Sequence, residues 1–390
     1  MKILVICQYY HPEPFRISDI CEEFEKQGHT VDVVTGTPNY PMGEIYEEYR
    51  KGKKRDEIIN GVNVHRCFTI GRKHGYIYRF LNYYSYAISS SNYVKRLKKD
   101  YDVVFVNQLS PVMMAQAGIT YKRKHQVKLV LYCLDLWPES LVAGGIKRGS
   151  LIYKLFHHVS KKIYKQADTI LITSKSFSDY FKHEFGILDT EYLPQYAEAL
   201  FTPEQCKKIP NGTIDLMFAG NIGSTQSVAT IIEAAALLKS RTNFRWHIVG
   251  DGSEIDNIKR LSDEYGLKSV IFHGRQPVEK MPEYYAMADV MLVTLSNDWF
   301  ASLTLPGKVQ TYMAAGKPVV GAVDGETAMV LNEIQGGYCG KAEDPAALAD
   351  NVLKLINSTK LEEVGKKNRL YYTEMFSKNS FMQKLGEHIR

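Results

Sequence analysis

Residues 218–226 read FAGNIGSTQ, so glycine and polar residues directly follow an apolar run. The apolar residues 214–219 predict a buried strand, and apolar residues at helical spacing follow the loop. Gly220 and Gly223 would expose backbone N–H groups between the two elements. Such groups at a helix N-terminus form a ready anion site. The pattern therefore favours phosphate binding, although two glycines in an α/β turn can also serve packing alone.

Four more strand-to-loop junctions follow this one. They read WHIVGDGS (246–253), VIFHGRQP (270–277), VMLVTLS (290–296) and PGKVQTYMAAGKPVV (306–320). Strands that alternate with helical patterns predict a parallel, doubly wound sheet. Ligands of such sheets gather at the carboxyl ends of the strands. The polar residues expected at those ends are Asn221, Asp251, Arg275 and Lys308.

The first half of the chain repeats this organisation. Strands are predicted over residues 2–7, 30–35, 62–68, 103–106, 129–134 and 169–173, and helices over 19–27 and 78–97. The Pro-rich, polar segment 193–213 is interpreted as an interdomain linker. Further helices are predicted over 344–357, 360–372 and 376–389. The expected fold class is α/β, with two Rossmann-like domains facing each other across a cleft that suits two substrates. We expect an N-terminal domain of residues 1–192 and a C-terminal domain of 193–375, with helix 376–390 packing back on the first.

Composition narrows the class of protein. The chain has 390 residues, 45% of them hydrophobic, and no apolar run has the ~18 residues of a membrane span. MKILVICQYY at the start is interpreted as a first strand and not as a signal peptide. Six scattered cysteines without a CxxC pair indicate reduced thiols in a cytosolic protein and no zinc site. The net charge of +6 is concentrated before residue 196, where 28 Lys and Arg face 20 Asp and Glu. Such an excess of basic residues favours the binding of phosphate groups or of an anionic membrane surface. No nucleic-acid-binding motif accompanies it.

At this point the chain resembles the retaining glycosyltransferases of family 4, which have the GT-B fold, over nearly its full length. The resemblance is carried, in order, by YYHPEPFR, GHTVDVVTGTPNYP, DLWPES, FAGNIGSTQS, IVGDGSE, FHGRQP and PGKVQTYMAAGKPVV. Within the family the chain is similar to enzymes that add N-acetylfucosamine or related amino sugars during O-antigen and capsule assembly. The resemblance implies a UDP-sugar donor in the C-terminal domain, an acceptor against the N-terminal domain, and no cofactor.

The chain departs from the family pattern at four positions of the donor half and at Leu134, where many relatives have a histidine. An Arg and a Lys of the first C-terminal loop are replaced by Asn221 and Gln226, and the paired glutamates by Leu303 and Thr311. The amides can hydrogen-bond a phosphate but carry no charge. Lys308 is therefore the first choice for the charged phosphate contact, with a solvated lysine at a helix start as the alternative.

The predicted donor site consists of the residues at the strand ends and of the residues at these substituted positions. Arg275 is the second choice for the charged phosphate contact, with a salt bridge on its loop as the alternative, and the backbone beside it suits the base. Glu326 is a further polar candidate, with a carboxylate at a helix start as the alternative. The full set is Gly220, Asn221, Gly223, Ser224, Gln226, Gly250, Asp251, Gly274, Arg275, Gln276, Pro277, Thr311 and Glu326.

On the N-terminal side, YCLDLWPES is the strongest candidate. Asp135 follows a predicted strand and is expected to orient the acceptor hydroxyl or to stabilise positive charge at the sugar carbon; a helix cap is the alternative. Trp137 with Pro138 offers a flat apolar surface for a sugar ring. Arg16 is expected to grip an acceptor phosphate or to pair with Glu13. The predicted acceptor contacts are Tyr9, His11, Glu13, Arg16, Asn39, Tyr40, Trp137 and Glu139.

The predicted mechanism is front-face substitution in which the leaving diphosphate takes the acceptor proton and Lys308 stabilises the departing charge. No DxD motif lies in a convincing loop, so metal independence is predicted. The basic first half and the aromatic residues 76–93 suggest a polyprenyl-diphosphate-linked acceptor at the inner membrane face, although residues 76–93 could equally be a core helix. Two rival readings stay open: a UDP-sugar 2-epimerase, and a non-catalytic sugar-nucleotide-binding protein.

Overall fold

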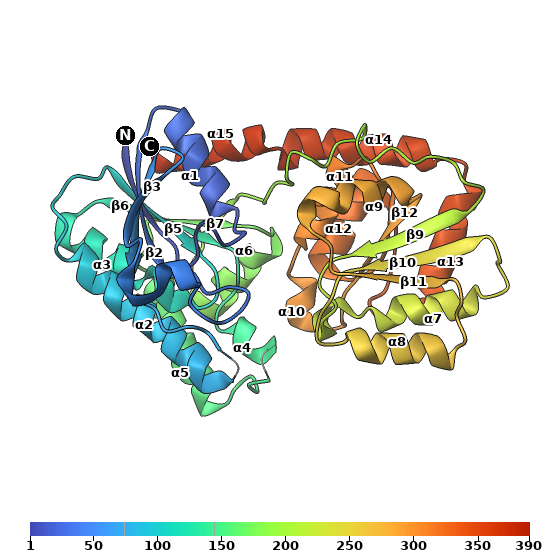
Figure 1. Ribbon diagram of the computed structural model, residues 1–390, viewed down its shortest axis with the longest axis horizontal. Coiled ribbons are helices and arrows are strands. Elements are labelled where there is room, and N and C mark those ends of the chain that lie inside the picture. Colours follow the sequence, from blue (N-terminus) through green and yellow to red (C-terminus); the bar gives the residue numbers. More distant parts are fainter. Residues whose placement is uncertain (74, 144) are drawn as a thin grey trace. The chain divides into compact units, whose positions relative to one another are not determined.

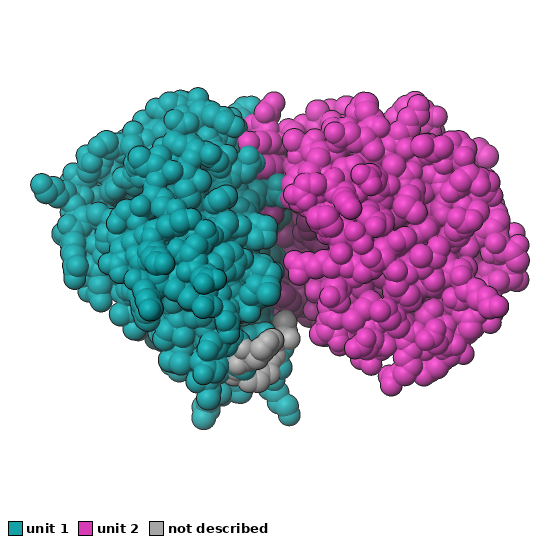
Figure 2. All heavy atoms as spheres, viewed as in Figure 1, with its two compact units in different colours: residues 1–173, 177–193, 382–390 teal, residues 174–176, 194–381 magenta. Residues whose placement is uncertain are grey.

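The computed structural model describes residues 1–73, 75–143 and 145–390 (Figure 1). The side chains of Tyr76 and Ala143 lie outside that description. The prediction for residues 76–93 therefore applies to the described residues without the side chain of Tyr76. The chain divides into two compact units, coloured separately in Figure 2. Unit 1 consists of residues 1–173, 177–193 and 382–390, and unit 2 of residues 174–176 and 194–381. Each unit has its own sheet.

Unit 1 is built on an eight-stranded sheet of order β3-β4-β2-β1-β5-β6-β7-β8 (Figure 1). All neighbours pair in parallel except β3 with β4. Consecutive buried residues in β1 and β5 explain their central place, because parallel strands are covered on both faces. The strands are β1 (Lys2–Ile6), β2 (Thr30–Gly36), β3 (Asp56–Ile59), β4 (Val62–Cys67), β5 (Val103–Gln108), β6 (Lys128–Cys133), β7 (Thr169–Ile172) and β8 (Glu191–Tyr192).

Helices connect these strands. In the first of them, Ile17, Ile20, Cys21 and Phe24 are buried at helical spacing, which gives the helix one apolar face. The helical elements are α1 (Ile17–Lys26), η1 (Glu47–Gly52), α2 (Tyr76–Val94), η2 (Val112–Ala115), α3 (Gln116–His125), α4 (Glu139–Ala143), α5 (Leu151–Tyr164), α6 (Ser176–Tyr180), η3 (Phe181–Phe185) and, at the end of the chain, α15 (Lys378–Ile389).

Unit 2 is built on a six-stranded parallel sheet of order β11-β10-β9-β12-β13-β14. The chain runs outward from β9 on one side and returns to pair β12 on the other. Loops that leave neighbouring strands in opposite directions open a crevice at their carboxyl ends, which is where such sheets bind ligands. The strands are β9 (Ile214–Ala219), β10 (Phe244–Val249), β11 (Val270–Gly274), β12 (Val290–Thr294), β13 (Val319–Ala322) and β14 (Gly337–Gly340).

Helices cover both faces of this sheet (Figure 1). On one face, apolar residues of α7, α8 and α13 form a continuous core with β9 and β10, centred on Phe218, Trp246 and Ile231. The helical elements are η4 (Ser224–Gln226), α7 (Ala229–Leu237), α8 (Ile255–Glu264), η5 (Val278–Lys280), α9 (Met281–Met287), α10 (Trp299–Ser302), α11 (Gly307–Ala314), α12 (Gly325–Ile334), α13 (Pro345–Asn357), α14 (Leu361–Tyr371) and η6 (Tyr372–Phe376).

The predicted class of two Rossmann-like α/β domains is confirmed, and the predicted strands of the first half lie within one or two residues of β1, β2, β4, β5, β6 and β7. Three strands were not predicted, namely β3, β8 and β14; β8 is only two residues long. β3 is short and lies next to the basic segment, and β14 consists of GYCG, whose glycines carry no strand signal. Segment 193–213 has no strand or helix, as expected, but it is packed on unit 2, where Phe201 and Cys206 are buried. All six cysteines are unpaired and five of them are buried.

Candidate functional site

The loops after β9 and β10 meet at the carboxyl edge of the unit 2 sheet. Gly220 and Gly250 have φ values of +150° and +143°, which side chains rarely adopt. A Cβ added to Gly250 would lie 1.8 Å from the carbonyl oxygen of Gly220. The backbone N–H of Ile222 donates to the carbonyl oxygen of Asp251 at 2.9 Å. Only glycine therefore allows these two backbones to approach so closely and to stay joined.

The side chain of Gln226 joins the two ends of the predicted phosphate loop by hydrogen bonds. Gln226 Oε1 accepts hydrogen bonds from Asn221 Nδ2 at 3.0 Å and from the backbone N–H of Gly223 at 3.2 Å. Ser224 is exposed at the start of the single turn η4, which precedes α7. The carbonyl oxygen of Gln226 accepts from Thr294 Oγ1 at 2.6 Å, so the loop is fixed to the end of β12. The predicted strand, loop and helix are confirmed, and Asn221 and Gln226 are neighbours.

Lys308 points into this loop from the first turn of α11. A Cβ placed on Gly220 would lie 2.8 Å from Lys308 Nζ, and Nζ lies 3.7 Å from the centre of the Phe218 ring. The side chain as a whole is partly exposed, but its Nζ is buried and has no hydrogen-bond partner among the residues that the structure describes. Burial without a counter-charge lowers its pKa to about 7. A buried, unpaired ammonium costs free energy unless an anion joins it. The loop and Lys308 therefore fit a diphosphate.

Two tyrosines position α11 against the end of β9. Tyr312 Oη bridges the backbone of Ala219: it accepts from the N–H at 3.0 Å and donates to the carbonyl oxygen at 3.1 Å. Thr311 Oγ1 donates to the carbonyl oxygen of Lys308 at 2.8 Å and lies 3.1 Å from Tyr285 Oη. The Thr311 hydroxyl thus already has two partners, and its predicted ribose contact stays a prediction.

The loop after β11 lies next to these two. Gly274 has φ +66°, and its carbonyl oxygen accepts from the N–H of Gly250 at 2.9 Å. Gln276 Nε2 donates to the carbonyl oxygen of His273 at 2.7 Å. Arg275 and Pro277 are exposed on this loop. The side chain of Asp251 is used locally, since its Oδ1 accepts from Gly252 N–H at 2.8 Å. The structure thus brings the predicted strand ends to one edge of unit 2.

Glu326 follows the carboxyl end of β13, which pairs in parallel with β12. It is 1% exposed at the start of α12. Its Oε1 accepts from the N–H of Lys175 at 2.9 Å, and its Oε2 accepts from the N–H and hydroxyl of Ser176 at 2.9 and 2.7 Å. Three donors therefore already occupy this carboxylate, and a contact between Glu326 and the donor stays a prediction.

A polar chain inside unit 2 was missed by the sequence reasoning. His247 Nε2 lies 2.8 Å from Asp215 Oδ1, and its Nδ1 lies 2.9 Å from His273 Nε2. Asp215 also pairs with Lys208, and these hydrogen bonds hold the pKa of Asp215 below its usual range. The available signal was a buried-strand position occupied by Asp215 in β9, His247 in β10 and His273 in β11. This chain of groups ends beside the loop of Arg275.

In unit 1, Glu13 joins two of the predicted acceptor loops. Glu13 is 2% exposed. Its carboxylate accepts from the backbone N–H groups of Asn39 at 2.9 Å, Tyr40 at 2.8 Å and Tyr10 at 3.3 Å. Burial raises its pKa to about 7, against the opposite effect of these hydrogen bonds. Glu13 therefore orders the loops after β1 and β2 from inside, and its contact with an acceptor stays a prediction.

Aromatic rings cover the same corner. Tyr9 stacks on Phe15 with ring centroids 5.0 Å apart, and Phe15 lies 5.1 Å from Tyr40. The Tyr9 hydroxyl is buried, and burial raises its pKa, while Arg72 acts in the opposite direction. Asn39 is 1% exposed, and its Oδ1 accepts from the backbone N–H of Arg72 at 3.2 Å and from Asn82 Nδ2 of α2 at 3.3 Å. The other two predicted contacts of the first loop differ in setting: His11 is exposed, and Arg16 is at the start of α1.

Asp135 follows β6, as predicted. Its Oδ2 accepts from the backbone N–H of Ser110 at 3.2 Å, which joins the loops after β5 and β6. Burial raises its pKa, while hydrogen bonds from Ser110 and the charge of Arg72 oppose the rise. Arg72 also lowers the pKa of Tyr9, so its guanidinium lies near both candidates. Sequence reasoning missed Arg72, although the polar residues Arg72 and Lys73 follow an apolar strand in the same way as the residues singled out.

The expected flat sugar-binding surface at Trp137 is wrong. Trp137 is 2% exposed, and its ring packs edge-on against Phe156 at 5.1 Å. Its Nε1 donates to Ser110 Oγ at 3.2 Å. Glu139 is 1% exposed, and its Oε1 accepts from Tyr153 and Tyr180 at 2.5 and 3.1 Å. Both side chains are therefore enclosed by unit 1 and hold the turn after β6.

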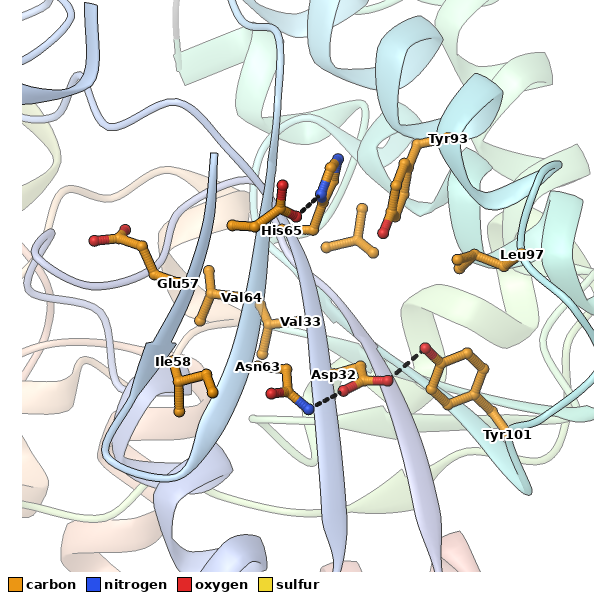
Figure 3. Close-up of a pocket in the computed structure, with 12 residues that line it drawn as sticks. Asp32, Val33, Glu57, Ile58, Asn63, Val64, His65, Tyr93, Leu97 and Tyr101 are labelled. Carbon is orange, nitrogen blue, oxygen red and sulfur yellow. Dashed lines mark hydrogen bonds and ion pairs between the residues drawn. The ribbon is translucent and has the colours of Figure 1, made fainter. Parts of the chain in front are cut away.

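A separate cavity of about 430 Å³ lies in unit 1 at the outer strands β2, β3 and β4 (Figure 3). Asp32 accepts from Asn63 Nδ2 at 2.7 Å and from Tyr101 Oη at 2.5 Å. His65 Nδ1 lies 2.5 Å from Asp56 Oδ1. These polar groups satisfy one another, and they lie outside the carboxyl ends of the strands. The cavity is thus distinct from the predicted sites.

No group of three or more His, Cys, Asp or Glu within ranges 1–73, 75–143 and 145–390 could hold a metal ion. In the same ranges no helix is long and apolar enough to cross a membrane.

Comparison with known proteins agrees with this geometry in both halves. The family described as "Glycosyltransferase Family 4" matches residues 16–192, and "Glycosyl transferases group 1" matches residues 204–370. The chain is a glycosyltransferase of the GT-B fold. The predicted enzyme class is therefore confirmed, while the N-acetylfucosamine specificity stays a prediction.

Relatives of this glycosyltransferase are distant. It is 26% identical to the probable glycosyltransferase WbjE of Pseudomonas aeruginosa, over 67% of this chain and 68% of that protein. It is 24% identical to the putative colanic acid biosynthesis glycosyl transferase WcaI of Escherichia coli K12, over 81% and 82%.

Solved structures share the fold. A sucrose-phosphate synthase from Thermosynechococcus elongatus has a TM-score of 0.77 at 16% identity, with 99% of this chain and 97% of that chain covered. Anabaena HepE in complex with UDP-glucose has a TM-score of 0.70 at 16% identity, with 99% and 98% covered.

Proposed function

We propose that this glycosyltransferase transfers a sugar from a UDP-sugar bound at the carboxyl edge of the unit 2 sheet. The observation that carries the proposal is the buried, unpartnered Nζ of Lys308 beside the turn at Gly220. A diphosphate there would supply the missing anion, and backbone N–H groups of the Gly220–Gln226 loop would share its charge. The similarity in fold to a protein solved with UDP-glucose supports the choice of uridine.

The proposed chemistry retains the configuration at the sugar carbon. The bond between the sugar C1 and the diphosphate oxygen breaks, a bond from C1 to the acceptor oxygen forms on the same face, and the acceptor proton passes to the leaving diphosphate. Lys308 stabilises the negative charge that develops on that diphosphate, which is electrostatic catalysis. No cofactor or metal enters the proposal. Asp135 would orient the acceptor hydroxyl or stabilise positive charge at C1.

The proposed donor is a UDP-amino sugar, N-acetylfucosamine or a similar sugar, in bacterial surface polysaccharide synthesis. The relatives named for glycosyl transfer and colanic acid biosynthesis support the polysaccharide part. The proposed acceptor is a polyprenyl-diphosphate-linked saccharide, so the reaction would take place at the inner face of the cell membrane.

A thermal-shift screen against UDP, GDP, ADP and UDP-amino sugars, including UDP-N-acetylfucosamine, tests the donor site. Ligand at ~100 times its Kd stabilises the folded state by about 2.7 kcal/mol, a shift of several degrees for a unit of this size. The Lys308→Ala variant should lose the shift, and Lys259→Ala, which removes an exposed lysine on α8, should keep it.

The outcomes separate the rival functions. A shift with UDP species only, followed by transfer to an acceptor, supports the proposal. Conversion of free UDP-sugar without acceptor would favour the 2-epimerase reading. Nucleotide binding without turnover would favour the non-catalytic protein, and equal shifts in the Lys308→Ala variant would remove Lys308 from the site.

A further inference from the structure

A chain of polar side chains runs through the sheet of unit 2, where apolar residues are expected. Asp215 in β9 is 1% exposed, and His247 in β10 is 2% exposed. Strands of a parallel sheet are normally apolar on both faces, because helices cover both faces. Burial of a carboxylate and an imidazole costs free energy unless partners satisfy them. The two side chains therefore need an explanation beyond the folding of unit 2.

The inner end of the chain holds the Asp215 carboxylate in its ionised form. Lys208 forms one ion pair with Asp215 and a second one with Asp289, the latter at 3.1 Å. Asn211 Nδ2 donates to Asp215 Oδ2 at 3.0 Å. Burial acts to raise the pKa of Asp215, but the hydrogen bonds from Lys208 and the other donors outweigh it and hold the pKa below its usual range. The carboxylate can therefore only accept hydrogen bonds.

The positions of the protons on two histidines follow from that carboxylate. His247 Nε2 lies 2.8 Å from Asp215 Oδ1, so this nitrogen carries a hydrogen. His247 Nδ1 lies 2.9 Å from His273 Nε2, and one hydrogen lies between them. With both rings neutral, His247 Nδ1 is bare, His273 donates from Nε2, and His273 Nδ1 is an acceptor. One extra proton, on either ring, makes His273 Nδ1 a donor instead.

The surrounding charges favour the neutral pair of histidines. The two carboxylates beside the chain, Asp215 and Asp289, already interact with two lysines, because the charge of Asp289 acts on Lys317 as well as on Lys208. A further cation on the histidines would therefore be buried without an anion of its own. Burial lowers the pKa of His273, and a charge on the neighbouring imidazole lowers it further. His273 Nδ1 is thus an acceptor at neutral pH.

His273 is an extra residue in its strand. Ile248 pairs with Phe272, but Val249 pairs with Gly274, so the register of β10 and β11 shifts by one residue at His273. Bulges of this kind re-aim a side chain and are frequent beside active sites. The shift lies at the carboxyl end of β11, where the proposed donor site begins.

The His273 ring joins the buried chain to the loop after β11. The ring is half-buried, stacks on His247 with centroids 5.1 Å apart, and packs edge-on against Tyr284 of α9 at 5.1 Å. The carbonyl oxygen of His273 accepts from Gln276 Nε2 at 2.7 Å, which holds the loop 274–277 to the same residue. A change at His247 would therefore reach the loop through His273.

We propose that Asp215 and His247 are positioning residues for the base of the nucleotide. Through His273 they hold the loop 274–277 and keep His273 Nδ1 as an acceptor at the base end of the donor site. An acceptor there suits a base with an N–H, as uracil has at N3, and disfavours cytosine, whose N3 carries no hydrogen. The inference rests on the proposed function, because it concerns the same nucleotide site and adds which groups select the base.

The ratio of UDP affinity to CDP affinity tests this role, because the two nucleotides differ only in the base. Calorimetry on the full chain should show that the wild type binds UDP about tenfold more tightly than CDP. His247→Phe keeps a ring in the sheet but can bond neither Asp215 nor His273. In this variant UDP affinity should fall until the ratio is close to one, while CDP affinity stays within a factor of about two.

A matched control removes another buried polar side chain of unit 2. Asn368 is fully buried, and its Nδ2 donates to the carbonyl oxygens of Lys317 and Gly336 at 2.8 and 2.7 Å. Asn368→Leu loses these bonds at similar side-chain size, so it should lower the melting temperature without changing the ratio of UDP to CDP affinity. A ratio that changes equally in both variants, or that stays unchanged in His247→Phe, would overturn the proposal.

The imidazole nitrogen signals of the wild type in NMR give a second test that needs no variant. At pH 7.5 both rings should carry a hydrogen on Nε2 and none on Nδ1, and UDP should shift the His273 Nδ1 signal more than CDP does. A hydrogen on His273 Nδ1 in the unliganded protein, or equal shifts with the two nucleotides, would contradict the proposal.

Failure of this inference and failure of the proposed function are distinguishable. A wild type that binds neither nucleotide contradicts the donor site and this inference together. Tight UDP binding by the wild type, with the same ratio of UDP to CDP affinity in His247→Phe, contradicts this inference alone.

Discussion

Replacing Lys308 by methionine should make the unliganded protein more stable and its nucleotide site weaker. Methionine keeps the length of the aliphatic chain over the Phe218 ring and removes the charge that has no partner in the structure. The pKa of Lys308 is about 7 in the folded protein, against an ordinary value of 10.5. At ~1.36 kcal/mol per pKa unit, burial of this lysine lowers the free energy of unfolding at pH 7 by at most roughly 4 kcal/mol.

The sign of the pH dependence follows from the direction of the shift. Because the folded pKa lies below the unfolded one, the cost is fully present below pH 7 and disappears as the pH rises from about 7 to about 10.5. The Lys308→Met variant lacks this cost at every pH. Its advantage in the free energy of unfolding should therefore shrink by about 1.4 kcal/mol per pH unit above pH 7.

UDP affinity should move in the opposite direction. A hydrogen bond to a charged group contributes roughly 1.5–3 kcal/mol, so the variant should bind UDP about 10- to 100-fold more weakly. The wild type must take up a proton on Lys308 to bind a diphosphate. Its affinity should fall about tenfold per pH unit above pH 7.5, where the terminal phosphate is already ionised.

Urea unfolding monitored by tryptophan fluorescence measures the stability difference, and isothermal titration calorimetry at pH 7, 8 and 9 measures UDP affinity. Calorimetry in buffers of different ionisation enthalpy reports the proton uptake directly. A variant that is no more stable than the wild type would contradict the burial argument. A wild-type affinity that stays flat between pH 7.5 and pH 9 would contradict the role of Lys308 at the diphosphate.

The other predictions concern the glycine turn, the acceptor side and the loop carboxylate. Gly220→Ala would place a Cβ 2.8 Å from Lys308 Nζ at a φ of +150°. We therefore expect the free energy of unfolding to fall by roughly 1–3 kcal/mol and the UDP shift in the thermal assay to be weaker. The control Gly386→Ala, where a Cβ meets nothing within 4 Å, should be tolerated. Asp135→Asn should lower kcat by about 100-fold or more while UDP affinity in calorimetry stays within a factor of two, since Asp135 lies in unit 1 and is proposed to act only on the acceptor or the transition state; a change in UDP affinity of the same size as the change in kcat would refute that assignment. Glu13, whose folded pKa of about 7 lies above the ordinary 4.5, should lower the free energy of unfolding by up to about 3 kcal/mol as the pH rises from 4.5 through 7, and Glu13→Gln should lack this slope in urea titrations at pH 5 and 8. Activity should persist in EDTA; its complete loss, restored by a divalent cation, would disprove metal independence.

Much of the fold could be predicted because it depends on local patterns. Apolar runs of five or six residues followed by glycine or polar residues identified β1, β9, β10 and β12 and the loops at their ends. β14 could not be predicted in this way, because a strand of GYCG is specified by its partner β13 and not by its own residues. The same holds for β3, which exists only as the antiparallel neighbour of β4.

The candidate site was predicted where a residue's position on a strand end was enough. Asn221, Gln226 and the glycines of unit 2 converge on one edge because parallel strands end together. For Trp137 and Glu139 a position after a strand was not enough, because both side chains turn into unit 1. Phe156 packs against Trp137, and Tyr153 and Tyr180 donate to Glu139. The direction of a side chain after a strand depends on what packs beside it.

The sequence by itself determined two largely parallel sheets, the glycine turn at residues 220–223 and an excess of basic residues in the first half, because each depends on residue type and spacing along the chain. Tertiary structure alone decided that Lys308 Nζ is buried without a partner, that Glu13 holds three backbone N–H groups, and that α2 turns Ile77 and Ile88 outward and Asn82 inward. These properties depend on the distance between residues far apart in the sequence, which sets both the loss of water and the available partners. A lysine at a helix start is an ordinary cation in water, and it becomes an anion site only where β9 and α11 together exclude the solvent.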